Sequence, residues 1–314
     1  MVKQHPFDTP GGGGVSGELL FVDGPDGPIV VKRALPKLKV AADWFASPKR
    51  SAVEAACLRV LADVLGQDCV PRVLWVDEQA HSFAMQRLPD RYVVWKARLL
   101  RCDVDLTTAA RVGQLLGQMH TRTSDRPDLA EQFDNRAYLF DLRIRPYHQR
   151  VAERQPRLAE AIDGVVQRML LDRRCLVHGD FSPKNLLTDG PAVVVLDCEV
   201  AHWGDPRFDV AFCLSHLLLK TLHSASCSAG LAQATTAYLD AYAEAGLKVL
   251  DQELSRATGC LVLARVVGDS PVDYLHTPAL RDAAFRLGEG LLVDPPAPGK
   301  CVERALENRM RSSC

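Results

Sequence analysis

Near the start of the chain, short apolar runs are separated by turn residues, a pattern typical of β-strands. Runs at 18–23 and 28–34 flank a cluster of Asp, Gly and Pro residues, which predicts a β-hairpin. Runs at 72–77 and 81–86 predict two further strands. Over 51–65, apolar residues recur every three or four positions, as on the buried face of an amphipathic helix. We therefore expect a small sheet that carries one helix.

The pattern changes to helical periodicity in the rest of the chain. Apolar residues at three- and four-residue spacing over 109–120 and 157–171 predict two long helices, each with one buried face. Between 175 and 197 the apolar runs are shorter and are separated by Gly, Pro and Asp, which predicts small strands and loops. Helical patterns return after Asp209. This larger part of the protein is therefore expected to be mainly helical.

A turn signal at 88–90 divides the two regions. The chain has 314 residues, which is long enough for two lobes at roughly 150 residues per domain. We place an N-terminal lobe at residues 1–88 and a C-terminal lobe at residues 89–314. The predicted fold class is α+β, with a small β-rich lobe followed by a larger, mostly helical one.

The composition is that of an ordinary globular protein, with 47% hydrophobic and 25% charged residues. Lys and Arg total 38 against 39 Asp and Glu, so the chain lacks the positive excess that binds nucleic acid or an acidic membrane surface. No apolar run is long enough to span a bilayer, and the first residues lack the apolar core of a signal peptide. We predict a cytoplasmic protein without nucleic-acid or membrane partners. The sequence gives no indication of the oligomeric state.

Ten cysteines are scattered along the chain, without a C-x-x-C pair or a His/Cys cluster at zinc-like spacing. Several lie inside apolar helical patterns, where a thiol behaves as a small core residue. We therefore expect reduced thiols.

Three polar residues follow one another in a fixed order. Asp180 is followed five positions later by Asn185, and Asp197 comes directly after an apolar run. Phosphoryl transfer from ATP needs one group that orients and deprotonates the attacking hydroxyl, and oxygen ligands that hold Mg²⁺ against the phosphates. Asp180 fits the first task, and Asn185 and Asp197 fit the second. A single Asp or Asn is common in turns, but the ordered set favours a catalytic interpretation.

These residues resemble the aminoglycoside phosphotransferase and choline kinase superfamily, small-molecule kinases with the protein-kinase-like fold. The segment from His178-Gly179-Asp180 to Asn185 is similar to the family's catalytic loop, and Asp197 to its metal-binding aspartate. The continuation through Glu199 and Trp203-Gly204-Asp205-Pro206 is also similar, with methylthioribose kinases close in style. The resemblance implies a bilobal fold in which residues 1–88 bind the nucleotide and residues 89–314 carry the catalytic and substrate-binding groups. It also implies that Asp209 starts a helix and bonds back to the catalytic loop.

The same resemblance implies how a nucleotide is held. Lys32, in an apolar strand pattern, fits the strand lysine that grips the α- and β-phosphates, and Glu54 on the next helix is the best candidate to orient it. Met85 and Leu88 fall in the segment where the family offers backbone groups to adenine. The expected cofactors are ATP and Mg²⁺, and GTP stays open as an alternative donor. The glycine run at 11–14 is either a phosphate-contacting loop or an N-terminal linker.

The acceptor is the least defined part of the prediction. Polycationic aminoglycosides would favour a strongly acidic pocket, whereas residues 200–314 have no large acidic excess. Arg143 and Arg145, if they border the cleft, suit a neutral or anionic hydroxyl compound, and a solvated basic face is the alternative. Glu199 and Asp205 are further candidates for substrate contact, and Glu199 also for metal contact.

Together these features predict ATP-dependent transfer of the γ-phosphoryl group to a hydroxyl of a small molecule. Two alternatives remain. A protein kinase is disfavoured because the chain has no Asp-Phe-Gly and no later Ala-Pro-Glu segment. A non-catalytic nucleotide-binding module, or pseudokinase, would lack one of the catalytic residues, and none is missing.

Overall fold

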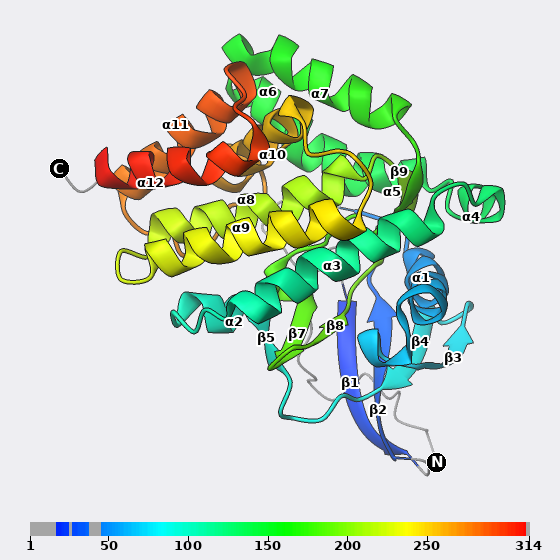
Figure 1. The fold of residues 1–314 in the computed structure, drawn as a ribbon. Helices are drawn as coiled ribbons and strands as arrows, with labels where there is room; N and C mark the ends of the chain where they lie inside the picture. Colours follow the sequence, from blue (N-terminus) through cyan, green and yellow to red (C-terminus); the bar gives the residue numbers. More distant parts are fainter. Residues whose placement is uncertain (1–16, 25–26, 38–44, 312–314) are drawn as a thin grey trace.

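The computed structural model describes residues 17–24, 27–37 and 45–311 (Figure 1). The glycine run at 11–14 lies outside the described residues. The N-terminal lobe is a sheet in the order β1-β2-β4-β3, with all neighbours antiparallel. Its elements are β1 (Gly17–Gly24), β2 (Gly27–Ala34), α1 (Arg50–Leu65), β3 (Val73–Asp77) and β4 (Ser82–Gln86). The predicted hairpin, the two further strands and the intervening helix are confirmed.

The C-terminal lobe is mainly helical, as its apolar periodicity predicts. The described helices are α2 (Trp95–Leu100), α3 (Leu106–Thr123), α4 (Pro127–Gln132), α5 (Arg136–Leu139), α6 (Arg150–Arg154), α7 (Ala159–Leu171), α8 (Arg207–His223), α9 (Ser228–Ala245), α10 (Gln252–Val267), α11 (Pro278–Val293) and α12 (Cys301–Arg311). A π-helix, η2 (Phe140–Gln149), joins α5 to α6 and contains Pro146. The helices predicted at 109–120 and 157–171 correspond to α3 and α7, and α7 is preceded by the 3-10 turn Pro156–Leu158.

Small strands between α7 and α8 carry the loops predicted at 175–197. Strands β5 (Val93–Val94), β7 (Leu186–Asp189) and β8 (Ala192–Val195) form one antiparallel sheet, and β6 (Cys175–Val177) pairs with β9 (His202–Gly204). The predicted lobe boundary at residue 88 falls between β4 and β5. The backbone pairing of these strands holds the loops between them at both ends. The loops after β6 and β8 lie close together.

Helix α8 is the central element of the large lobe (Figure 1). Its residues from Phe208 to Leu222 are all buried, as expected for a mostly apolar helix at the centre of a lobe. It packs against α9, α10 and α12, and α3 packs against both α9 and α1. A single apolar core therefore continues from α1 of the small lobe into the helices.

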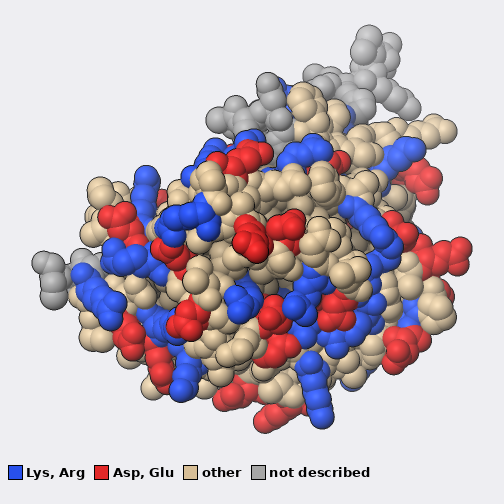
Figure 2. Space-filling view, turned by 90° about the horizontal axis from the view of Figure 1, so that it is seen from above, with Lys and Arg blue, Asp and Glu red and all other residues tan. Residues whose placement is uncertain are grey.

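The surface carries both signs of charge. Figure 2 shows Lys and Arg side chains interspersed with Asp and Glu over the face in view, in line with the near balance of the sequence. None of the helices in the described ranges is long and apolar enough to cross a membrane. The cytoplasmic location stays a prediction.

The cysteines differ in part from the expectation. Cys102, after α2, forms a disulfide with Cys227, just before α9, so the expectation of reduced thiols is wrong for this pair. The bond joins two loops 125 residues apart in sequence. The free cysteines of the described residues are all buried, as predicted for core thiols.

Candidate active site

The catalytic loop predicted at 178–185 connects β6 to β7. Gly179 has a φ of +79°, a backbone conformation that favours glycine. A Cβ at this position would lie 2.5 Å from the carbonyl oxygen of Val200. The loop therefore packs directly against the chain that leads to β9, and no larger residue fits at Gly179.

Asp209, in the first turn of α8, holds this loop in place. Its carboxylate accepts hydrogen bonds from the backbone N–H groups of His178 at 2.6 Å and Gly179 at 2.9 Å. The side chain is fully buried, with the His120 Nε2 atom 3.3 Å away. Burial alone would raise the pKa of Asp209, but the contact with His120 and the bond from His178 hold it below its usual value. The bond back to the loop is the one that the family resemblance implied.

His178 links the catalytic loop to the chain before Asp197. Its Nε2–H faces the carbonyl oxygen of Leu196 at 2.9 Å, and its Nδ1 accepts from the backbone N–H of Asp180 at 3.1 Å. Both ring nitrogens are therefore engaged in structural hydrogen bonds. The ring orients the loop and has no nitrogen left for proton transfer.

Asp180 is buried and lies between two cations. Its Oδ2 atom is 2.8 Å from the Lys184 Nζ and 3.3 Å from the Arg143 Nη2. Burial would raise the pKa of Asp180, but Lys184 and Arg143 hold it below its usual value, so the carboxylate is charged at neutral pH. Its other oxygen, Oδ1, is buried without a hydrogen-bond partner among the described residues. One carboxylate oxygen is thus anchored, and the other is available to a hydroxyl group.

Asn185 and Asp197 are brought together by backbone pairing. The backbone N–H of Leu196 donates to the carbonyl oxygen of Asn185 at 2.9 Å. The Asn185 side-chain nitrogen donates to the carbonyl oxygen of Asp180 at 2.9 Å, which leaves its side-chain oxygen for a metal ion. Asp197 has a φ of +63°, an uncommon conformation for a residue other than glycine. Such strain is typical of functional positions, where the surrounding structure imposes it.

Lys32 and Glu54 form a buried ion pair between β2 and α1. The Lys32 Nζ lies 2.8 Å from Glu54 Oε1 and 2.7 Å from Oε2, and it also contacts the carboxylate of Asp197. Lys32 is fixed in the sheet opposite Leu19 and Phe83. The structure therefore pairs Lys32 with Glu54, the candidate partner named from the sequence, and brings this pair next to Asp197 of the large lobe.

Three carboxylates are crowded at this point. Oxygens of Glu54, Asp197 and Glu199 all lie within 4.8 Å of one another. Burial raises the pKa of Glu54 to about 8 against the attraction of Lys32, and the charges of Asp197 and Glu199 add to the rise. Mutual repulsion of this kind favours a bound cation, and oxygen ligands of these types suit Mg²⁺. Glu199 thus lies beside the predicted metal ligands.

Sequence reasoning missed Arg50, at the start of α1. It is fully buried, and its Nε donates to Glu199 at 2.9 Å while its Nη2 donates to the carbonyl oxygen of Leu35 at 2.8 Å. Arg50 offsets part of the negative charge that Glu199 adds to the site.

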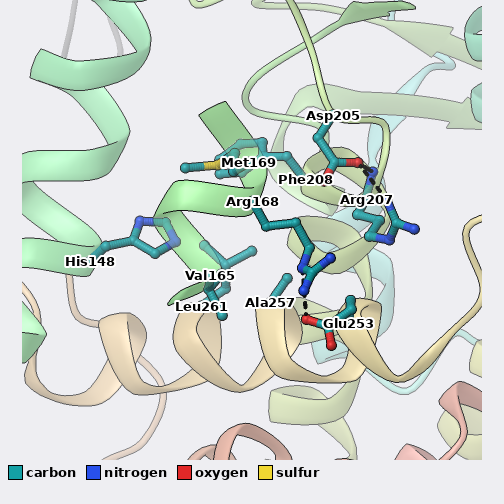
Figure 3. A pocket seen from close by; sticks show the side chains of 10 residues that line it. All are labelled: His148, Val165, Arg168, Met169, Asp205, Arg207, Phe208, Glu253, Ala257 and Leu261. Carbon is teal, nitrogen blue, oxygen red and sulfur yellow. Dashed lines mark hydrogen bonds and ion pairs between the residues drawn. The ribbon is translucent and has the colours of Figure 1, made fainter. Parts of the chain in front are cut away.

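Two of the predicted substrate residues lie elsewhere. Arg145 is exposed and pairs with Asp141 at 3.4 Å, whereas Arg143, two residues earlier, is buried against Asp180. Asp205 accepts a hydrogen bond from the Arg207 backbone and lines a different cavity, together with His148 and Glu253 (Figure 3). That cavity measures about 20 Å³, enough for little more than a water molecule. Arg145 belongs to a solvated face and Asp205 to the start of α8.

Met85 lies in β4 opposite Val30, and Leu88 follows two residues after the strand ends. Their part in holding adenine stays a prediction.

The two lobes, the lysine–glutamate pair and the Asp-Asn-Asp set define the class of protein-kinase-like phosphotransferases. The model of the phosphotransferase enzyme family, APH, matches residues 9–256, and the chain belongs to this family. The resemblance read from the catalytic loop is confirmed.

Relatives with known names are kinases of small molecules. The chain is 26% identical over 219 residues to a methylthioribose kinase of Pectobacterium atrosepticum and 25% identical over 221 residues to one of Bacillus velezensis. These matches cover 61% and 62% of this chain, and 54% and 55% of the relatives. The chain therefore spans about half the length of the curated relatives that it matches.

Solved structures confirm the predicted bilobal fold. A choline/ethanolamine kinase family protein from Mesorhizobium loti superposes with a TM-score of 0.53 at 15% identity, over 98% of this chain and 96% of that one. An amicoumacin kinase in complex with AMP-PNP and Ca²⁺ has a TM-score of 0.52 at 12% identity, over 98% of this chain and 88% of that one. At these identities the likeness identifies the fold alone.

Proposed function

We propose that this protein transfers the γ-phosphoryl group of ATP to a hydroxyl group of a small molecule. The observation that carries the proposal is the convergence of Lys32, Asp180, Asn185 and Asp197, from separate elements of both lobes, on one site. Membership of the phosphotransferase family supports it. A cytoplasmic location is the matching prediction.

Asn185 and Asp197 would hold Mg²⁺ through oxygen atoms, the ligand type that this ion prefers. Glu199, whose carboxylate lies within 4.8 Å of that of Asp197, is a further candidate ligand. When bound, the metal ion neutralises charge on the β- and γ-phosphates. Lys32, oriented by Glu54, contacts the α- and β-phosphates, and backbone groups from Met85 to Leu88 contact the purine. GTP remains the alternative donor.

Asp180 orients the acceptor hydroxyl and receives its proton. The unpartnered Oδ1 atom is the oxygen that accepts the hydroxyl, because Lys184 and Arg143 both bind Oδ2. Asp209 and His178 keep the loop rigid, so the carboxylate holds its position during the transfer. A pseudokinase is disfavoured by the presence of this complete set.

The acceptor is a small hydroxylated compound. Kinases for methylthioribose, choline or ethanolamine, and amicoumacin are among the similar proteins, which favours a small molecule over a protein acceptor.

The test is ADP release from Mg-ATP with a panel of hydroxylated metabolites and antibiotics, compared between the wild type and Asp180→Asn. At least one acceptor should be phosphorylated by the wild type, and the variant should be roughly 100- to 10,000-fold slower. Equal rates in both proteins would contradict the assignment of Asp180. Peptide phosphorylation at a higher rate than any small molecule would favour a protein kinase.

A further inference from the structure

Two buried arginines face the same pair of aromatic rings beside Asp180. Tyr147 of η2 and Phe212 of α8 are stacked with centroids 6.0 Å apart. The Cζ of Arg143 lies 5.6 Å from both centroids, and the Cζ of Arg265, on α10, lies 4.9 and 5.3 Å from them. Arg143 also contacts Asp180. Two positively charged side chains, Arg143 and then Arg265, therefore follow one another from the Asp180 carboxylate.

Helix α8 extends this charge along one face. Phe212, His216 and Lys220 follow one another at four-residue spacing, so their side chains lie on the same side of the helix. The Lys220 Nζ lies 5.2 Å from the ring centroid of Tyr274, and the Lys96 Nζ lies 5.8 Å from the same centroid. We call Lys96, Arg143, Lys220 and Arg265 the cationic cluster. His216 lies among them as a neutral imidazole, because burial and the charges of Arg265 and Lys220 hold its pKa well below the ordinary value.

The cationic cluster lacks matching carboxylates. Among the described residues, neither Lys220 nor Arg265 forms an ion pair with an acidic side chain. The Lys220 Nζ donates to the backbone carbonyl of His216 at 3.2 Å, and Arg265 donates to Ser270. The carboxylates that contact the cluster are Asp180, shared with Lys184, and Asp273, which is exposed and binds Lys96.

These side chains are also deeply buried. Lys220 is 1% exposed, and Arg265 and His216 are each 7% exposed. A buried charge normally has a partner of opposite charge, since burial removes its hydration. Cation–π contacts with Tyr147, Phe212 and Tyr274 recover only part of that loss.

Two polar atoms beside the cluster have no partner among the described residues. They are His216 Nε2 and the Tyr274 hydroxyl, both buried. Buried polar groups are normally hydrogen-bonded, so each unpaired atom calls for a ligand. An oxyanion would accept hydrogen bonds from the Tyr274 hydroxyl, from Lys220 and from the Nε2–H of the neutral His216 ring together.

Shifts of pKa in the same region agree with a positive local potential. Burial lowers the pKa of Lys220 to about 7, and the charges of Lys96 and Arg265 act in the same direction. Burial raises the pKa of Tyr147, but Arg265 and Arg143 outweigh it and hold the value below normal.

We propose that the cationic cluster binds the anionic group, a carboxylate or a phosphate, of the hydroxylated acceptor whose hydroxyl lies at Asp180. This inference rests on the proposed function and narrows its acceptor. Arg143 touches both Asp180 and the aromatic pair that Arg265 faces, so Arg143 connects the two positions. Such an acceptor differs in charge from choline and from methylthioribose.

The first test compares matched acceptors by their kcat/KM with Mg-ATP. The pairs are D-ribose 5-phosphate with D-ribose, and D-gluconate with D-glucitol, with choline as a cation. At least one anionic member should be preferred over its neutral partner by roughly tenfold or more, the effect of one charge-assisted hydrogen bond. The ribose pair tests recognition of a phosphate group, and the gluconate pair tests recognition of a carboxylate.

Lys220→Met and Arg265→Met test the residues themselves, because methionine keeps much of the side-chain volume and removes the charge. Each should lower kcat/KM for the anionic acceptor by roughly ten- to a hundredfold and change the neutral one little. Lys248→Met and Arg286→Met, at exposed positions, are the matched controls. Normal Mg-ATP affinity shows that each variant is folded. Equal kcat/KM within both pairs, or variants that lower neutral and anionic acceptors alike, would overturn the proposal.

A binding measurement keeps the inference separate from the proposed function. Calorimetric titration of the enzyme saturated with Mg-AMP-PNP uses D-gluconate and inorganic phosphate as probes. Binding that is lost in both variants supports the anion site even if no acceptor in the panel is phosphorylated, in which case the proposed function alone is in doubt. Absence of binding for both probes, or binding unchanged in the variants, would refute the site.

Discussion

Replacing Asp209 with asparagine tests how the catalytic loop is held. The wild-type carboxylate accepts two backbone hydrogen bonds, at 2.6 and 2.9 Å, inside a fully buried environment. Asparagine has the same shape, but one of its two terminal atoms is an N–H₂ donor. One of the loop amides at His178 and Gly179 would therefore face a donor and lose its partner.

The size of the effect follows from these contacts. A hydrogen bond to a charged group contributes about 1.5–3 kcal/mol, and a buried donor left unpaired costs about 1–3 kcal/mol. We expect Asp209→Asn to lower the free energy of unfolding by about 3–5 kcal/mol, a large part of the usual 5–15 kcal/mol. Turnover should fall with it, because the loop that carries Asp180 loses one of its two anchors.

The assay is urea unfolding of the wild type and Asp209→Asn, with Asp282→Asn on the exposed face of α11 as the control. The control should change the free energy of unfolding by less than about 0.5 kcal/mol. A change below about 1 kcal/mol in Asp209→Asn, with normal turnover, would refute the anchoring role.

The pH dependence gives a second check on Asp209. Its pKa in the folded state is below that of the unfolded chain, so its stabilisation is complete above the unfolded value, about 3.9. It is lost as the pH falls through the folded value. The stability difference between wild type and Asp209→Asn should therefore be constant from about pH 5 to 8 and shrink only in acid.

Three further substitutions test the site. Asp197→Ala should weaken binding of Mg-ATP far more than binding of metal-free ATP in calorimetry, because the carboxylate acts through the metal; equal losses would make Asp197 structural. Gly179→Ala should lower the free energy of unfolding by at least about 1–3 kcal/mol, because alanine is strained in the left-handed backbone conformation, and the contact with Val200 adds a further cost. An unchanged free energy of unfolding would contradict the close packing of the loop. Arg50→Met leaves Glu199 without its buried partner and should lower the free energy of unfolding by about 3–5 kcal/mol. The control is Arg59→Met, on the exposed face of α1. Equal effects of the two substitutions would show that the Arg50–Glu199 pair is unimportant for stability.

The elements that the sequence predicts are those whose residues form a local pattern. The apolar run and turn residues of the β1–β2 hairpin, and the three- and four-residue spacing in α1 and α3, are local signals, and no distant part of the chain is needed to read them. The candidate catalytic set could be proposed for a related reason, since Asp180 and Asn185 lie in one loop and Asp197 follows soon after.

The parts that were missed depend on tertiary contacts. The disulfide between Cys102 and Cys227 joins two loops with no spacing signal. Arg143 and Arg145 are alike in sequence, yet the π-helix buries the first and exposes the second. Lys220 did carry a signal: α8 is mostly apolar along its whole length, so a lysine in its last turn is expected to be buried with it. A charge inside such a helix is a candidate ligand contact even when no motif marks it.

The charges around Asp180 also bear on what this carboxylate would contribute to the proposed reaction. General-base catalysis is most effective when the pKa lies near the working pH, whereas Lys184 and Arg143 keep that of Asp180 below its ordinary value. Asp180 is therefore a weak base whose position is tightly fixed. Phosphoryl transfer through a loose transition state needs little basicity, because the hydroxyl proton leaves late, and gains most from alignment. In this site the two cations weaken the base and fix its geometry, and Arg143 extends the same positive charge toward the group that we propose binds the acceptor.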